Sequence, residues 1–239
     1  MRDQMSFQSN YSPAATGAVG IDQGLRAYML GVYRYMAGGL GLTGLVALLT
    51  VSSPVLLQAI FGSGLHWLLF IAQIGLVLWL SLRIDRLSFG AVRAIYWSYA
   101  ALNGLTLSVL LLAYTGESVA RVFFITAASF GALSIYGYTT KKDLTAFGSF
   151  LIMGLFGLIL ASIVNIFLPS GPLSFVISAV GVLIFAGLTA YDTQKIKLMY
   201  DGYDSAELAG KKSVMGALAL YLDFINLFIY LLRFLGERR

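Results

Sequence analysis

Cysteine is absent from the 239 residues, and His66 is the only histidine. Without cysteine the chain forms no disulfide, no thiolate metal site and no cysteine nucleophile, and a single imidazole excludes a histidine cluster. The serine-hydrolase pattern G-x-S-x-G is also absent. Because no nucleophile, metal cluster or cofactor motif is found, we expect a protein that is not an enzyme and that needs no cofactor.

Charged residues are scarce as well, at 11%, whereas ordinary soluble domains contain about 25%. Hydrophobic residues make up 59% of the chain, so we expect it to lie in a lipid bilayer. The net charge of +5 does not indicate a nucleic-acid partner, because most basic residues fall in short segments between apolar stretches. Nucleic-acid binding is therefore excluded from the expected functions.

Long apolar stretches recur seven times along the chain. They lie at residues 35–57, 66–82, 94–114, 119–140, 144–168, 173–191 and 214–235, and each is long enough to cross a membrane. Their continuous hydrophobicity indicates helices, since a barrel strand would alternate between apolar and polar residues. We therefore predict an all-α membrane protein, with a flexible polar tail at residues 1–26 and a seven-helix transmembrane domain at residues 27–239.

Basic residues predict the orientation of these helices. Most of the lysines and arginines lie in the tail and in the connections after the second, fourth and sixth stretches, which places the N-terminus in the cytoplasm. The basic C-terminal end, Arg238 and Arg239, is the exception, because seven crossings place it on the opposite side. A six-span arrangement or a re-entrant segment is the alternative.

One carboxylate lies inside an apolar stretch. Asp223 stands near the centre of the last span, where an acidic residue costs about 2.5 to 3.5 kcal/mol on insertion scales. A partner, a proton or a water-lined cavity must offset this cost. Asn226 lies on the same helical face and is a candidate hydrogen-bond donor to Asp223. Asp223 is thus the first candidate for a functional residue.

A second carboxylate, Asp192, closes the sixth span. Taken by itself, Asp192 needs no functional role, since its carboxylate can reach water or pair with Lys195. Spans six and seven run antiparallel, however, and the two carboxylates then face each other if depth allows. Asp192 lies nine residues, or roughly 13 Å, from the centre of span six at Leu183. Contact with Asp223 therefore requires span six to run past Lys195, a vertical offset or a tilt.

Two segments around these aspartates resemble the Bax inhibitor (transmembrane Bax inhibitor motif) family. They are residues 190–194 (AYDTQ) and residues 221–226 (YLDFIN), with supporting stretches at residues 122–144 and 151–168 that look like spans four and five of bacterial members. The resemblance covers nearly everything after Tyr28. It implies a seven-helix fold in which the last helix is central and wrapped by the other six, and a pH-sensitive leak of Ca²⁺ across the membrane.

By this resemblance, Asp192 and Asp223 take the positions of the family's paired aspartates. Two carboxylates in a poorly hydrated site cannot both ionise cheaply, so the pair is expected to share a proton that cytoplasmic pH can remove. Released carboxylates offer hard oxygen ligands, so we expect transient calcium at the pair and no fixed metal. Arg83 matches an arginine near the end of span two in some members, but Ala72 and Gln73 leave the acid of that span missing.

Two functions remain after this comparison of the residues. The first is a pH-sensitive leak channel for calcium or other cations in a bacterial inner membrane, with the aspartate pair as proton switch. The second is a membrane interaction protein that regulates other membrane proteins, such as a membrane protease, with aspartates that serve only structure. Calcium flux through the purified protein distinguishes the two.

Overall fold

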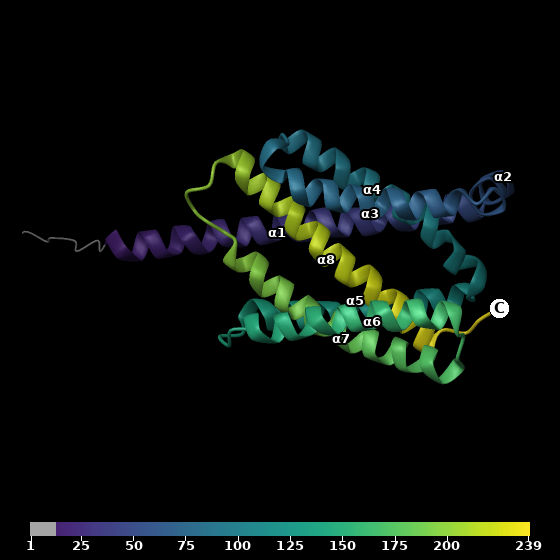
Figure 1. The fold of residues 1–239 in the computed structure, drawn as a ribbon. Helices are drawn as coiled ribbons and strands as arrows, with labels where there is room; N and C mark the ends of the chain where they lie inside the picture. The colour runs from purple at the N-terminus through teal and green to yellow at the C-terminus, as the bar shows by residue number, and fades with distance from the viewer. Residues whose placement is uncertain (1–12) are drawn as a thin grey trace, which may run out of the picture.

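Seven long helices make up most of the computed structural model, which describes the backbone of residues 13–239 and the side chains of residues 23–239 (Figure 1). The elements in chain order are α1 (Pro13–Val51), α2 (Pro54–Leu57), the short π-helix η1 (Gln58–Gly62), α3 (Leu65–Arg83), the 3₁₀ turn η2 (Ile84–Arg86), α4 (Phe89–Ala113), α5 (Gly116–Thr139), α6 (Thr145–Phe167), α7 (Gly171–Leu198) and α8 (Ala206–Leu235). The seven helices long and apolar enough to span a membrane confirm the predicted all-α membrane fold.

Several helices are longer than the apolar stretches that predicted them. The first membrane-spanning segment begins at Gln23, α7 continues to Leu198 and α8 begins at Ala206. Hydropathy detects only the part of a helix that lies in hydrocarbon, whereas the hydrogen-bonded helix continues into the polar interface. The prediction of a tail at residues 1–26 lies partly outside the described residues. Residues 13–26 belong to α1, and the flexibility expected of this segment stays a prediction.

Serine and threonine side chains start most of the spans. Ser88, Thr115, Ser170 and Ser205 each accept a hydrogen bond from a backbone N–H in the first turn of α4, α5, α7 and α8. Such caps satisfy N–H groups that have no partner within the helix. The connections that follow α3, α4, α5, α6 and α7 are short, and they place successive helices antiparallel.

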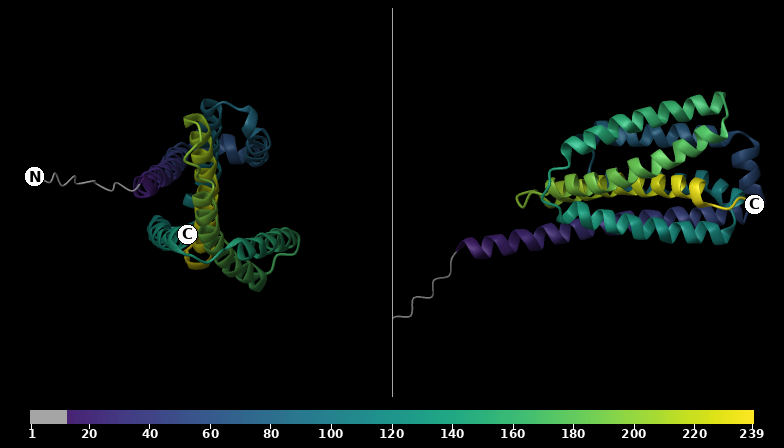
Figure 2. Two further views of the ribbon diagram at one scale, coloured as in Figure 1. Left: turned by 90° about the vertical axis from the view of Figure 1, so that its left-hand side faces the viewer. Right: turned by 90° about the horizontal axis from the view of Figure 1, so that it is seen from below.

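The C-terminal helix α8 is the centre of the bundle, as the family resemblance implies. It is the most deeply buried of the seven spans, and α1, α4, α5 and α7 pack directly against it. Figure 2 shows α8 with α1, α3 and α4 on one side and α5, α6 and α7 on the other. Helix α3 packs on α4, and helix α6 packs on α7. Four of the six other spans therefore pack on α8, and these two form an outer layer.

Two hydrophobic clusters meet along α8. The first joins α1, α4 and the part of α8 around Tyr221, and the second joins α6, α7 and the part of α8 from Leu227 to Leu232. Asp223 lies near the junction between the two clusters. The centre of the bundle is therefore apolar on both sides of this carboxylate.

The two ends of the described chain lie at opposite ends of the bundle (Figure 2). After α8 the chain pairs with the α4–α5 connection: Arg239 N donates to Ala113 O and Thr115 N donates to Glu237 O, both at 3.1 Å. Arg121 and Glu237 form an ion pair at the same place. Helix α8 thus crosses the whole bundle, as the seven-span arrangement requires.

Candidate functional site

Asp192 and Asp223 meet between α7 and α8. Asp223 is only 4% exposed and lies in the middle of α8, while Asp192 is partly buried near the C-terminal end of α7. Helix α7 runs past Lys195 to Leu198, which is one of the conditions that contact required. The two side chains that the sequence singled out are therefore brought together by the extension of α7.

The two carboxyl groups lie close enough to interact directly with each other. One carboxyl oxygen of Asp223, Oδ2, is buried and has no hydrogen-bond partner among the described residues. A carboxylate only accepts hydrogen bonds, so a bond between two carboxyl groups requires a proton on one of them. Burial of two neighbouring carboxyl groups favours one shared proton over two negative charges, as in other carboxyl dyads.

The residues that follow the two aspartates in sequence pack against α5. The ring of Phe224, next to Asp223, packs edge-on against Phe130 and Phe123 of α5, with centroids 5.5 and 5.6 Å apart. The hydroxyl oxygen of Thr193, next to Asp192, lies 3.4 Å from that of Ser134. These neighbours are neutral, so they supply no charge that would offset ionisation of both carboxyl groups.

The cation nearest to Asp192 in sequence, Lys195, acts on it by charge but forms no ion pair with it. Lys195 stands one turn beyond Asp192, is exposed, and its ammonium lies 5.8 Å from the centre of the Tyr191 ring. No ion pair involves either aspartate among the described residues. The expected alternative, in which Asp192 pairs with Lys195, is therefore not the contact that the structure contains.

Sequence comparison identifies the family to which this arrangement belongs. The family model described as Inhibitor of apoptosis-promoting Bax1 matches residues 25–239, which is most of the chain. The chain belongs to the Bax inhibitor family. An uncharacterized protein of Rickettsia prowazekii is 50% identical over 91% of this chain and 92% of the relative. The inner membrane protein YbhL of Escherichia coli is 47% identical over 90% and 94%, and an uncharacterized protein of Caulobacter vibrioides is 46% identical over 95% of both chains.

In this Bax inhibitor family member, Asn226 does not support Asp223 in the expected way. Its amide donates to the backbone carbonyl of Leu222 on the same helix, at 2.8 Å. A side chain that bonds to the carbonyl one turn back lies along its own helix. The hydrogen bond from Asn226 to Asp223 that the sequence suggested is not among the contacts of the described residues.

Arg83 likewise lies apart from the aspartates. It is the last residue of α3, is exposed, and forms no ion pair with a described residue. Helix α3 belongs to the outer layer of the bundle and packs on α4, not on α7 or α8. Gln73, in the span that lacks an acid, donates to Leu102 O and Thr106 Oγ1 of α4 and so joins α3 to α4. No three-way latch with Arg83 is formed.

Two further residues of α7 hold the site in place, and the sequence did not single them out. Gln194 accepts a hydrogen bond from Leu144 N and donates to Lys142 O, so it fixes the α5–α6 connection. Lys197 donates to Tyr138 O at 2.8 Å. Their position shortly after Asp192 could have indicated these contacts, because polar side chains at a buried helix end need hydrogen-bond partners.

Proposed function

We propose that this protein is a pH-sensitive leak channel for Ca²⁺ or other cations, gated by the Asp192–Asp223 pair. The observation that carries the proposal is the close approach of two carboxyl groups on adjacent helices, one of them buried in the centre of the bundle. A buried acid at this depth is costly for a purely structural role, and residues of this kind in membrane spans mark ion and proton paths.

The proton shared by the pair is the switch. When it leaves, two negative charges stand within hydrogen-bonding distance, and two such charges at 4 Å repel by about 4 kcal/mol at an effective dielectric constant of 20. Helices α7 and α8 are tightly packed around the pair, since the Tyr230 ring lies against Gly181 and Ile196 lies against Gly216. Repulsion of this size is comparable to the difference between two packings of a helix pair, so it favours a different α7–α8 arrangement.

A cation relieves the same repulsion. Among residues 23–239, no three histidine, aspartate or glutamate side chains come together. A cation that reaches the pair therefore meets two carboxyl groups, with backbone or water oxygens as its remaining ligands. A site with only two carboxylates should bind Ca²⁺ weakly enough for the ion to pass through, because Ca²⁺ takes about six to eight oxygen ligands in its sites.

The bacterial inner membrane is the proposed location. The relative named inner membrane protein YbhL supports it, as do the other bacterial relatives. The N-terminus is placed in the cytoplasm because most basic residues lie at that end of the bundle. With this orientation Asp192 lies in the cytoplasmic half, so cytoplasmic protons reach the pair first.

Calcium flux into liposomes tests the proposal. Purified protein should carry Ca²⁺ with a rate that changes across a series of pH values, because the pair shares a proton that pH can remove. Asp223→Asn and Asp192→Asn remove the shared proton, so each variant should show a flux that no longer depends on pH. Asp85→Asn, which changes an exposed acid in η2, should keep the pH profile of the unchanged protein.

The outcomes separate the two functions. A pH profile that is the same in Asp223→Asn as in the unchanged protein would show that the dyad is not the sensor. Absence of Ca²⁺ flux from the unchanged protein in pure lipid would overturn the channel and leave the regulator of other membrane proteins as the remaining function.

A further inference from the structure

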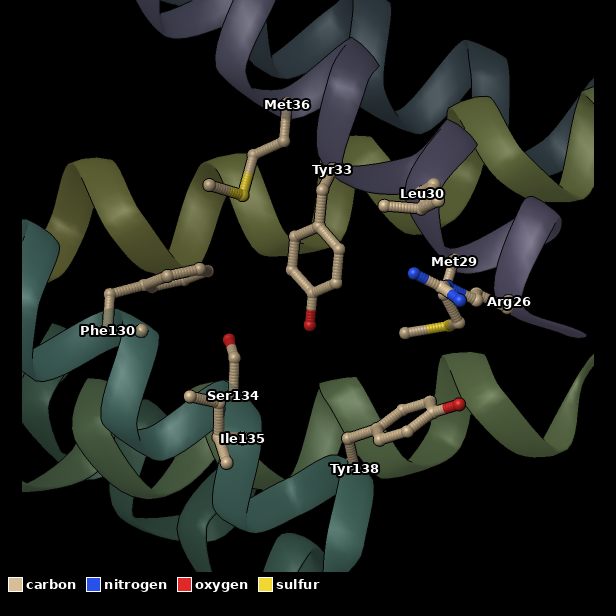
Figure 3. A pocket seen from close by; sticks show the side chains of 10 residues that line it. Arg26, Met29, Leu30, Tyr33, Met36, Phe130, Ser134, Ile135 and Tyr138 are labelled. Atoms are coloured by element: carbon tan, nitrogen blue, oxygen red, sulfur yellow. The ribbon is translucent and has the colours of Figure 1, made fainter.

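A groove opens between α1 and α5 on the flank of the bundle. It has a volume of about 640 Å³, in the range of ligand-binding pockets. Helices α1 and α5 each pack on α8 but make few contacts with each other. Figure 3 shows their side chains facing one another across the open space, with the hydroxyl groups of Tyr33 and Ser134 directed into it.

The walls of the groove are mostly apolar. Met29, Leu30 and Met36 line it from α1, and Phe130 and Ile135 line it from α5. Leu30 is 45% exposed and Ile135 66% exposed, so the groove is open toward the surface that faces lipid. Hydrated ions are poor occupants of such walls, because an apolar lining does not replace the water ligands that an ion loses.

One end of the groove is positively charged. Arg26 stands at this end, and among the described residues no carboxylate pairs with it. The Lys197 ammonium lies 4.8 Å from the centre of the Tyr138 ring, which also lines the groove. Both cations are at the end of the bundle that carries Lys141 and Lys142. An anionic group at this end would meet two positive charges and a tyrosine, which is the typical composition of a lipid headgroup site.

The length of the groove matches one leaflet. From Arg26 to Met36 the helix rises ten residues, or about 15 Å, which is half of a hydrocarbon core of about 30 Å. The deep end is formed by Met36 and Phe130, and Phe130 packs on Phe224 beside Asp223. An acyl chain that enters at Arg26 would therefore end at the middle of the bilayer.

We propose that this groove binds one anionic glycerophospholipid, with its phosphate at Arg26 and one acyl chain between α1 and α5. Charge, apolarity and length all point to this class of ligand: a cation at the interface, an apolar wall and the depth of one leaflet. Tyr33 lies between the two regions, where its hydroxyl faces the ester groups of the lipid. The proposal does not depend on the aspartate pair, so its failure would not affect the proposed channel.

Lipid retention measured by native mass spectrometry tests the site. The full-length protein, purified in detergent, is mixed with phosphatidylglycerol or with phosphatidylcholine of the same acyl chains. We expect one phosphatidylglycerol to be retained in preference to phosphatidylcholine. Arg26→Gln removes a charged hydrogen-bond donor and should reduce retention of phosphatidylglycerol about tenfold. Arg34→Gln, an exposed arginine of α1 that does not line the groove, should leave retention unchanged.

A second variant fills the groove itself. A Cβ added at Gly131 meets no atom within 4 Å, so Gly131→Trp places its ring in the open space without displacing backbone. This variant should lose retention of both lipids. Gly157→Trp on α6, where an added Cβ also meets no atom within 4 Å, is the matched control and should bind as the unchanged protein does.

Photo-crosslinking does not rely on any variant. The unchanged protein in nanodiscs is irradiated with phosphatidylglycerol that carries a photoreactive acyl chain, and the crosslinked peptides are mapped. Enrichment in residues 29–36 and 130–138 supports the site. Crosslinks spread evenly over α3 and α6 as well would show ordinary surrounding lipid and overturn the proposal. The proposal would also be overturned if the unchanged protein retained both lipids equally and Arg26→Gln retained as much phosphatidylglycerol as the unchanged protein.

Discussion

At the scale of single residues, the hydroxyl group of Thr43 connects three spans. The oxygen of Tyr221 on α8 lies 2.7 Å from Thr43 Oγ1 on α1, and Thr43 Oγ1 donates to Ala100 O on α4. Since the proton of Thr43 goes to this carbonyl, the Tyr221 hydroxyl is the donor to Thr43. Tyr221 is fully buried between the rings of Tyr96 and Tyr99, which pack edge-on against it. The chain of bonds fixes the rotation of α8 two residues before Asp223.

Tyr221→Phe should therefore lower the free energy of unfolding by about 1 kcal/mol, the net contribution of one hydrogen bond. Thr43→Val should cost more, about 1 to 3 kcal/mol, because it leaves the buried Tyr221 hydroxyl without a partner. Unfolding in mixed detergent micelles measures both changes. Tyr203→Phe, at a tyrosine that is 98% exposed, is the control. Equal stability of Tyr221→Phe and the control would contradict a structural role for this bond.

At the scale of helices, glycine sets how closely two spans approach. A Cβ at Gly137 of α5 would overlap the backbone carbonyl of Ala190 on α7, so only glycine allows this crossing. Small residues have this role in membrane bundles because no hydrophobic effect drives helices together there. The crossing lies within one turn of Asp192, and Ser134 contacts Thr193 beside it. The position of the aspartate pair thus depends on the contact between α5 and α7.

Gly137→Ala should reduce stability by about 1 to 3 kcal/mol, the usual cost of overpacking. Gly131→Ala, on the same helix, should be neutral or slightly stabilising, because its Cβ meets no neighbour and alanine favours a helix. Unfolding in micelles compares the two variants. A Gly137→Ala protein as stable as Gly131→Ala would show that α5 and α7 do not meet as closely as the structure has them.

At the scale of the whole molecule, the odd number of crossings determines which sides the loops face. The C-terminal residues pair with the α4–α5 connection, and the α5–α6 connection lies at the other end of the bundle. The exposed pair Arg121–Glu237 adds little stability, since ion pairs open to solvent contribute about 0 to 1 kcal/mol. The side of the C-terminus is therefore fixed by the passage of α8 through the bundle.

Cysteine labelling tests this topology without background, because the chain has no native cysteine. Lys141→Cys and Arg239→Cys should react with an impermeant maleimide from opposite sides of the membrane, with Lys141→Cys reached from the cytoplasm. Labelling of both from one side would contradict seven crossings. Opposite labelling with Lys141→Cys outside would keep seven crossings and reverse the proposed orientation.

Much of the fold followed from hydropathy, because the cost of exposing a backbone to lipid leaves few structures other than apolar helices. Asp223 was found because placing a carboxylate in an apolar span costs free energy that some other interaction must offset. The contacts of Asn226 and Arg83 did not follow from the sequence, since sequence spacing states which side chains share a helical face but not which neighbour that face meets. Gln194, Lys197 and the groove lined by Arg26 were missed for the same reason.

The sequence by itself determined that this chain is a seven-helix membrane protein with a carboxylate at bilayer depth, because these properties depend only on the local composition of each span. The tertiary structure decided that Asp192 reaches Asp223. That contact depends on the length of α7 beyond Lys195 and on the rotation and vertical offset of α7 and α8. Those quantities are set by the packing of glycines and aromatic rings from distant parts of the chain, which no local pattern specifies.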